Sequence, residues 1–545
     1  MARTPLLQAL QQLARDFTEA SEKNISVEEV QEKKRNAISR RDLLKGAGVI
    51  TAGVALSDPL NWGGQVFKAA ASGMPRIGII GAGIAGLNAA LTLQDAGLRS
   101  TVYEASSSIG GRIHSNTTSW ANGQVSEWCG ELIDTGHTLM QSLAKRFNLP
   151  LVDLHQAEPA GSEFTFYFFG KYYTQTQANQ DFKPVFKVLQ SQLKAAPQTF
   201  YNSYTSTGYQ LDHISVYDWI EQYVPDGHAS NMGQLLDVAY NSEFGRETTV
   251  QSSLNLLYLL AYQPKPGYLS IYGISDERYH IAGGNQQLPL AIANSLPSGS
   301  VKLNNRMNTI KKNNDTTIAV TFSTPTSSYQ ETFDHVILTL PFSVLRSLDY
   351  SKAGFNRLKQ TAIVQLGYGT NSKLQLQFDT RYWNGKGPWP GISTGEIFTD
   401  IGFQVTWEAT RGQPGATGII VEFPGGNYGA SYNPDGPYTT SNNAKVRQYA
   451  SQFLRKLEEI WPGISAHYTG TATLSYPTGD PNLLGSYSCW LVGQYTTFTG
   501  YEKVRQGNIH FAGEHCSYNY QGYMEGGARE GKRAANEILK DYHLI

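Results

Sequence analysis

Cysteine is scarce in this sequence, which contains only Cys129, Cys489 and Cys516 in 545 residues. Three cysteines without a CxxC pair provide neither a disulfide framework nor the usual ligands of a zinc site. An excess of charge is also absent, because 44 basic residues balance 45 acidic ones and the formal net charge is −1. This balance gives no electrostatic basis for binding nucleic acid or an anionic membrane surface. We therefore expect a small-molecule partner.

Long apolar runs are missing as well. No stretch of about 18 uninterrupted apolar residues occurs, so we expect no membrane-spanning helix in the mature chain. Hydrophobic residues make up 40% of the chain, however, which is too large a fraction for a disordered protein. A chain of 545 residues is also longer than a single compact core accommodates, so we expect two or three domains. Strand-like and helix-like patterns alternate without a fixed repeat, which favours an α/β architecture with insertions.

The N-terminal region contains SRRDLLKGAGVITAGVALSDP, in which the pair Arg40–Arg41 precedes a modest apolar run, and AAAS follows at 69–72. This pattern resembles a twin-arginine export signal. The preceding MARTPLLQALQQLARDF is long and amphipathic for such a signal, so a structural N-terminal helix is the alternative. The sequence thus predicts export to the periplasm or the extracellular space, or a cytoplasmic protein if the segment is structural.

The stretch RIGIIGAGIAGLNAALTLQDAG, residues 76–97, runs from a β-branched strand through a glycine turn into an Ala/Leu-rich helix. Gly81 permits the tight turn, Gly83 lets the backbone approach a pyrophosphate, and Gly86 lets helix and strand pack closely. The helix N-terminus offers free N–H groups to the anion. A second strand, STVYE, ends in Glu104, where a carboxylate can bind the ribose hydroxyls. These features predict a dinucleotide site.

A second glycine turn, in ASSSIGGRIHS, brings Gly111 and the guanidinium of Arg112 to the same pyrophosphate and favours FAD over NAD. With Glu104 before it, this element resembles the flavin amine oxidase family, which includes monoamine, polyamine and L-amino acid oxidases. The resemblance continues in YHIAGGNQQLPLAIA with VKLNNRMNTIKK, and in GNIHFAGEHCSYNYQGYMEGGAREGKRAANEIL. It implies FAD contacts from Gly81, Gly83, Ile84, Ala85, Gly86, Glu104, Ala105, Gly111, Arg112, Gly130, Glu131, Leu132, Met307, Glu514, Gly522, Tyr523 and Met524.

Two further stretches resemble parts of the family's reaction site. In TNSKLQLQFDTRYW, Lys373 resembles the lysine that holds a water against flavin N5 and assists the reaction with oxygen; a lysine on the solvent face of an edge strand is the alternative. In LVGQYTTFTGYE, Tyr495 resembles one wall of an aromatic substrate cage, opposite Tyr523. Gln494 stands where monoamine oxidases carry a flavin-linked cysteine, so we expect FAD to bind non-covalently.

The predicted fold is α/β with α+β insertions. A Rossmann-like FAD-binding domain is expected from residues 75–112, 276–360 and 503–545, and a mixed-sheet substrate-binding domain from 113–165 and 361–502. A helical domain is expected over 166–275, where helical spacing dominates, after an N-terminal segment at 1–74.

The resemblance implies oxidation of a C–N bond by hydride transfer to flavin N5, hydrolysis of the imine, and reoxidation by O2 with release of hydrogen peroxide. L-Amino acids are the expected substrates. At the two positions where related enzymes clamp the substrate carboxylate, however, this chain has Ile133 and Glu422. Glu422 instead suits the cation of an amine or polyamine, which is the alternative substrate class. A dehydrogenase, a non-catalytic flavin-binding module and a homodimer are further options that the sequence leaves open.

Overall fold

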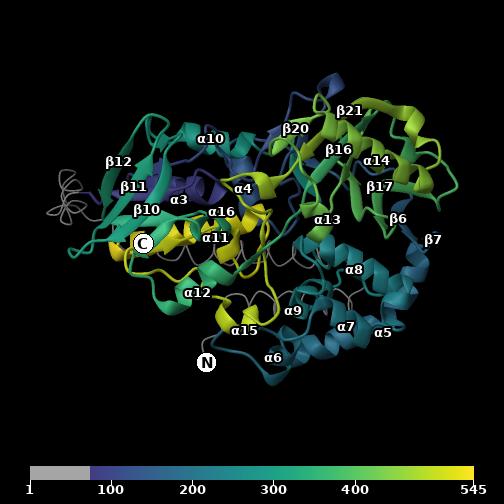
Figure 1. The fold of residues 1–545 in the computed structure, drawn as a ribbon, viewed down its shortest axis with the longest axis horizontal. Coiled ribbons are helices and arrows are strands. Elements are labelled where there is room, and N and C mark those ends of the chain that lie inside the picture. Colours follow the sequence, from purple (N-terminus) through teal and green to yellow (C-terminus); the bar gives the residue numbers. More distant parts are fainter. Residues whose placement is uncertain (1–73) are drawn as a thin grey trace, which may run out of the picture. The chain divides into compact units, whose positions relative to one another are not determined.

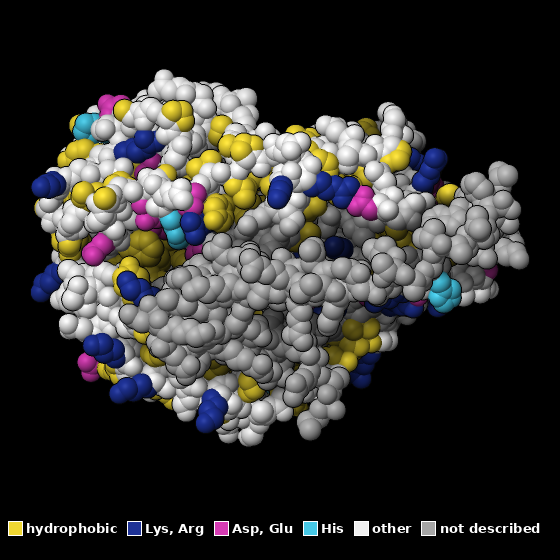
Figure 2. Space-filling model, turned by 180° about the vertical axis from the view of Figure 1, so that it is seen from behind, with side chains coloured by type: hydrophobic (Ala, Val, Ile, Leu, Met, Phe, Trp, Pro, Cys, Tyr) yellow, Lys and Arg dark blue, Asp and Glu magenta, His cyan; other side chains and the backbone are white. Residues whose placement is uncertain are grey.

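The computed structural model describes residues 74–545 (Figure 1), and the twin-arginine-like segment therefore lies outside the described residues. The described part combines several sheets with helices packed against them. Among these residues, no helix has the length and apolarity needed to cross a membrane. Figure 2 shows one face of the molecule, on which acidic and basic side chains are interspersed among uncharged ones.

A five-stranded parallel sheet has the strand order β23-β13-β1-β2-β9. Its central strand β1 is buried throughout and leads directly into helix α3. Helix α16 packs closely against α3, and Asn88 Nδ2 on α3 donates a 2.7 Å hydrogen bond to the carbonyl oxygen of Ala528 on α16. This doubly wound arrangement confirms the predicted Rossmann-like fold. Its elements are β1 (Ile77–Ile80), α3 (Ile84–Asp95), β2 (Thr101–Tyr103), β9 (Val301–Lys302), β13 (His335–Leu338), β23 (Ile509–Phe511) and α16 (Met524–Asp541).

A second, eight-stranded mixed sheet has the order β20-β21-β16-β19-β18-β17-β6-β7. Strand β16 is fully buried and pairs with β19 on one side and β21 on the other, so its first residue, Lys373, lies on an interior strand. The strands are β6 (Ser162–Phe168), β7 (Lys171–Tyr173), β16 (Lys373–Phe378), β17 (Ile392–Thr399), β18 (Val405–Glu408), β19 (Gly418–Glu422), β20 (Tyr438–Thr440) and β21 (Tyr468–Ser475).

The helical region begins later than the sequence predicts. Strands β6 and β7 form a hairpin of the mixed sheet, closed by Phe169 and Gly170 with φ of 52° and 73°. Helices follow only from Gln175, where Thr174 forms a capping box with Gln177. They are α5 (Gln175–Ala195), α6 (Ser206–Asp212), α7 (Val216–Tyr223), α8 (Asn231–Phe244) and α9 (Ser253–Leu260).

The remaining elements connect these layers. A four-stranded sheet has the order β12-β11-β10-β14. Three short two-stranded sheets are also present in the described part of the chain. The strands are β3 (Ser115–Asn116), β4 (Ser126–Glu127), β5 (Leu151–Asp153), β8 (Tyr279–Ile281), β10 (Arg306–Lys312), β11 (Ile318–Ser323), β12 (Ser328–Phe333), β14 (Asp349–Lys352), β15 (Gly367–Tyr368) and β22 (Ser488–Cys489). The helices are α4 (Thr138–Arg146), α10 (Gln287–Ser295), α11 (Phe342–Leu345), α12 (Arg357–Gln365), α13 (Gly426–Ala430), α14 (Ala444–Ile460) and α15 (Gln494–Phe498).

Candidate functional site

A cavity of about 490 Å³ joins the carboxyl ends of the parallel strands to the mixed sheet. It brings together most of the residues that the sequence singled out. Gly86, Tyr495 and Glu422 are not among its lining residues. The predicted residues that do line it are Gly81, Gly83, Ile84, Ala85, Glu104, Ala105, Gly111, Arg112, Gly130, Glu131, Leu132, Met307, Lys373, Glu514, Gly522, Tyr523 and Met524.

The two glycine turns face each other at one end of the cavity, where Gly83 and Gly110 form a parallel bridge. A Cβ atom added to Gly83 would meet only the Gly110 carbonyl oxygen, at 3.8 Å, so the space beside it is open. Gly83 caps α3 without a side-chain hydrogen bond, and the first turn of α3 has no acidic residue. A Cβ on Gly86, by contrast, would lie 2.0 Å from the Gly81 carbonyl oxygen, so this glycine serves helix–strand packing. The residues therefore fit a pyrophosphate at the N-terminus of α3.

Glu104 follows β2 at the same edge of the sheet. Its carboxylate accepts hydrogen bonds from the backbone N–H groups of Ala82 and Ser106, each at 2.8 Å. Each oxygen retains acceptor capacity toward the cavity, because a carboxylate oxygen offers two lone pairs. Met307, buried at the start of β10, lines the same end of the cavity. These positions suit the ribose and adenine of a dinucleotide.

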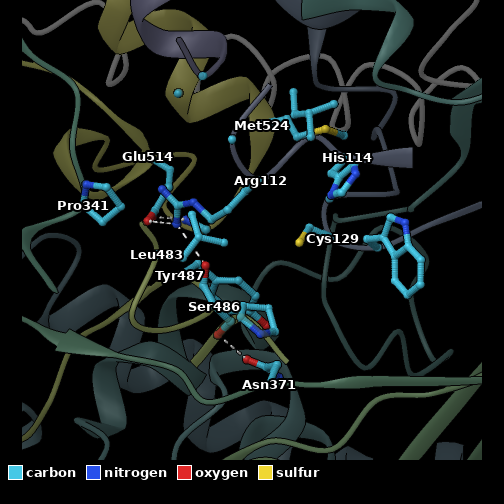
Figure 3. Close-up of a pocket in the computed structure, with 18 of the residues that line it drawn as sticks. Arg112, His114, Cys129, Pro341, Asn371, Leu483, Ser486, Tyr487, Glu514 and Met524 are labelled. Atoms are coloured by element: carbon cyan, nitrogen blue, oxygen red, sulfur yellow. Dashed lines mark hydrogen bonds and ion pairs between the residues drawn. The ribbon is translucent and has the colours of Figure 1, made fainter. Parts of the chain in front are cut away.

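An ion pair between Arg112 and Glu514 lies in the cavity wall (Figure 3), with 2.7 Å between Nη1 and Oε1. Glu514 also accepts hydrogen bonds from the Ser488 hydroxyl at 2.7 Å and the Gly522 N–H at 2.9 Å. Burial alone would raise the pKa of Glu514, but the charge of Arg112 and the hydrogen bond from Ser488 help to hold this pKa below its usual value. The N–H of Gly522 is thus engaged by Glu514, while Met524 begins α16 with an N–H that has no partner within the helix.

Lys373 enters the cavity wall from the interior strand β16, so the edge-strand interpretation is wrong. Its Nζ lies 2.7 Å from Glu131 Oε2 and donates to the Cys129 carbonyl oxygen at 2.6 Å. The Trp407 indole N–H donates to the other oxygen of Glu131 at 3.1 Å. Only about one twentieth of either charged side chain is exposed, at 6% and 5%. A buried pair of this kind is costly to break on one side only.

The aromatic wall opposite Tyr523 differs from the sequence prediction. Tyr495 is buried outside the cavity, where its hydroxyl donates to Asn255 Oδ1 at 3.1 Å. Tyr487 instead lines the cavity (Figure 3), and a Cβ on Gly522 would meet its ring at 3.5 Å. Both tyrosines precede a hydroxyl residue, in Tyr487–Ser488 and Tyr495–Thr496, so the local sequence alone does not distinguish them.

Glu422 does not reach the cavity, which corrects the expectation that it binds substrate. It pairs with Leu374 across the sheet, so it lies on the face opposite to Lys373, because successive strand residues alternate sides. Its carboxylate accepts hydrogen bonds from the hydroxyls of Tyr428 and Tyr432 at 2.5 and 2.9 Å. Burial raises the pKa of Glu422 to about 7. Ile133 is likewise buried and outside the cavity lining.

The sequence analysis did not predict five carboxylates of the cavity wall, Asp134, Glu243, Glu277, Glu396 and Asp480. Glu243 lies near the end of α8, Glu277 precedes β8, and Glu396 is in β17. No local motif joins these three segments, so only the folded chain brings them to one cavity.

Comparison with known proteins assigns the family. Residues 84–539 match the model of the flavin containing amine oxidoreductases. The Bacillus subtilis (strain 168) protein YobN, provisionally named an L-amino-acid oxidase, is 25% identical over 478 residues, covering 84% of this chain and 94% of that protein. An L-amino-acid oxidase of Siganus canaliculatus is 24% identical over 503 residues, covering 87% and 88%.

A solved structure adds a comparison of the fold. Cyclohexylamine oxidase from Brevibacterium oxydans IH-35A superposes with a TM-score of 0.71 at 20% identity. The superposition covers 86% of this chain and 100% of the cyclohexylamine oxidase chain. At this identity the likeness concerns the fold alone. The match over residues 84–539 is decisive: the chain belongs to the flavin-containing amine oxidoreductase family, whose members are flavin-dependent enzymes that act on amines.

Proposed function

We propose that this chain is an FAD-dependent oxidase that oxidatively deaminates a primary amine, using O2 and releasing hydrogen peroxide. The observation that carries the proposal is one cavity that runs from the glycine cradle to Lys373, Tyr487 and Tyr523. FAD, when bound, supplies the acceptor for the hydride that leaves the carbon bearing the amine. The glycine turns, Glu104 and Arg112 would hold the cofactor's phosphates and ribose.

The chain's own residues would align the substrate and exclude water. Tyr487 and Tyr523 present aromatic rings to the cavity and would hold the amine between them. Lys373 has three N–H donors, of which Cys129 and Glu131 accept two. The third donor would hold a water or oxygen molecule at Nζ, in a site where charge is stabilised more strongly than in solvent.

The charges of the cavity favour an amine without a carboxylate. Its lining contains two arginines, Arg112 and Arg306. Arg112 is paired with Glu514, and Arg306 donates to Asn482 Oδ1 at 2.9 Å, so both are engaged near the cofactor end. A bidentate clamp on a substrate carboxylate requires a free guanidinium.

L-Amino acids are the second candidate substrate class. Two relatives covering more than four fifths of the chain, at 84% and 87%, carry the name L-amino-acid oxidase. A peroxide assay across L-amino acids, their D-forms, primary amines and polyamines separates the two candidates. We expect peroxide with amines. Peroxide with L-amino acids alone would favour the second candidate, and no peroxide with any of them would contradict both.

We also propose that FAD is bound without a covalent link. Serine stands before Tyr487 and glutamine before Tyr495, so neither register offers a cysteine there. Cys129 lines the cavity, but burial raises the pKa of its thiol, which disfavours the nucleophilic thiolate.

Denaturing the holoprotein with acid should therefore release all of the yellow flavin into the supernatant. The flavin absorbance of supernatant and pellet measures this directly. Colour that stays with the precipitated chain would show a covalent bond, and a Cys129→Ser variant would then identify its site.

Export through the twin-arginine-like segment is proposed as well. Fractionation of cells that express the full chain tests it, with an Arg40→Lys/Arg41→Lys variant as the control. We expect the variant to be retained in the cytoplasm, whereas equal distribution of the two proteins would contradict export by this route.

A further inference from the structure

Two of the carboxylates that line the cavity, Glu243 and Glu277, have few polar partners in the protein. Within residues 74–545, Glu277 forms no ion pair, and its side chain accepts no hydrogen bond from a described residue. Glu243 accepts one long hydrogen bond, from the Tyr523 hydroxyl at 3.4 Å. Glu396, by contrast, accepts from the Thr394 hydroxyl at 3.0 Å and lies 3.7 Å from Arg411. In the described part of the chain, Glu104 and Asp480 form no ion pair either, but each accepts backbone N–H hydrogen bonds at 2.8 Å. Glu243 and Glu277 are therefore the least partnered carboxylates of the cavity wall.

Lys373 and Arg112, two cationic side chains that line the cavity, form ion pairs with carboxylates other than Glu243 and Glu277. Lys373 is paired with Glu131, and Arg112 is paired with Glu514. Placing a carboxylate in a partly buried cavity without a counter-charge is unfavourable. The pKa of Glu277 is raised well above its usual value by burial and by the neighbouring Glu243 and Glu396. Burial and Asp134 raise the pKa of Glu243 to about 7. A bound cation would supply the counter-charge that these two carboxylates lack.

The position of Tyr523 relates the carboxylates to the reacting end of the cavity. Its backbone belongs to the turn at the start of α16, beside Gly522 and Tyr487. Its hydroxyl points away from this turn, toward Glu243 and toward Ser275 Oγ at 3.2 Å. Glu243 thus stands at the hydroxyl end of Tyr523. Glu277 lies close by, because Asp134 accepts hydrogen bonds from the Ser275 hydroxyl at 2.8 Å and from the Glu277 N–H at 3.0 Å. A substrate amine held along this ring would extend its far end toward Glu243 and Glu277.

We propose that Glu243 and Glu277 select substrates with a second cationic group, separated by a short carbon chain from the amine that reacts. This inference rests on the proposed oxidation of an amine and names its substrate class. The shared chemistry is a terminal ammonium or guanidinium, which a diaminoalkane or a basic amino acid can supply. Paired carboxylates suit such a cation because each can accept a charge-assisted hydrogen bond from it.

The test compares 1,5-diaminopentane with 1-aminopentane, which lacks the second ammonium. We expect the wild-type enzyme to prefer the diamine by about tenfold or more in kcat/KM. Glu277→Gln should remove most of this preference, chiefly through KM, and leave 1-aminopentane within about threefold of the wild type. Glutamine preserves the size of the side chain and the backbone conformation at φ 46°. Glu243→Gln should act in the same direction, and flavin content checks that both variants fold.

Glu459→Gln is the matched control, because Glu459 is an exposed residue of α14 outside the cavity. A parallel pair, L-lysine and L-norleucine, distinguishes the two sources of the cation. If the enzyme oxidises neither amine but prefers lysine to norleucine, and if Glu277→Gln abolishes this preference, the result would support the second-cation inference and assign the substrate to the basic amino acids. Equal rates within each pair, or a preference that survives both variants, would overturn the inference alone. Oxidation of other primary amines or amino acids, but of none of these four compounds, would overturn the inference alone, whereas no oxidation of any amine or amino acid in the peroxide assay would overturn the proposed function itself.

Discussion

A Gly83→Val protein is expected to fold and to be purified without flavin. Gly83 has φ −75° and ψ 177°, an extended conformation that a valine adopts without strain. The nearest atom to an added Cβ is a carbonyl oxygen at 3.8 Å, so the protein itself leaves room for the Cβ. The branched methyl groups would instead occupy the space between the two glycine turns, where the pyrophosphate must approach the backbone. The ratio of flavin to protein absorbance measures the loss.

Gly136→Val is the matched control, because a Cβ at Gly136 meets no atom within 4 Å. Gly136 is exposed and outside the cavity lining. This control should keep a full complement of flavin and an unchanged melting temperature. Normal flavin content in Gly83→Val would refute the assignment of the cradle, whereas loss of folding would be seen as a changed circular dichroism spectrum.

Replacing Lys373 should slow reoxidation of the enzyme by O2 more than its reduction by substrate. The ammonium lines the cavity and retains one free N–H, so its removal withdraws stabilisation of charge that develops on oxygen. We expect the oxidative step to slow by about tenfold or more, which corresponds to at least ~1.4 kcal/mol of barrier. Stopped-flow measurement of the two half-reactions separates them.

Because Lys373 forms a buried ion pair with Glu131, the test requires a variant in which both residues are replaced. Lys373→Met alone would leave a buried carboxylate without its counter-charge, at a cost of about 3–5 kcal/mol in stability. A double variant, Lys373→Met with Glu131→Gln, removes both charges and avoids that cost. Glu131→Gln alone would leave the buried ammonium unpaired, so the wild-type protein is the reference that retains the ammonium. Reoxidation of the double variant should be about tenfold slower than in this reference. Equal reoxidation rates in the two proteins would make Lys373 a structural residue.

The parts of the site that the sequence predicted are those encoded by short contiguous motifs. A strand, a glycine turn and a helix specify the cradle of Gly81, Gly83 and Gly86, and the acidic end of the next strand specifies Glu104. Their neighbours are close along the chain, so local spacing determines their geometry. Glu514 and the turn Gly522–Met524 likewise stand next to one long helix, and the structure brings them to the same cavity.

The parts that the sequence did not predict depend on packing between distant segments. Tyr487 and Tyr495 have similar local contexts, but Tyr495 packs outside the cavity, where its hydroxyl donates to Asn255, 240 residues away. Glu422 was misplaced because its orientation depends on its strand register with Leu374. Glu243 and Glu277 lie on different elements and meet only in the folded chain.

Anaerobic mixing of the yellow holoprotein with a primary amine tests the central claim most directly. A flavin-dependent amine oxidase should lose its visible flavin absorbance when the amine is added, and admission of O2 should restore the colour with one hydrogen peroxide formed per flavin. We predict this cycle with 1,5-diaminopentane. A flavin spectrum that stays unchanged with diamines, monoamines and amino acids alike would contradict the assignment of this cavity as the site of amine oxidation.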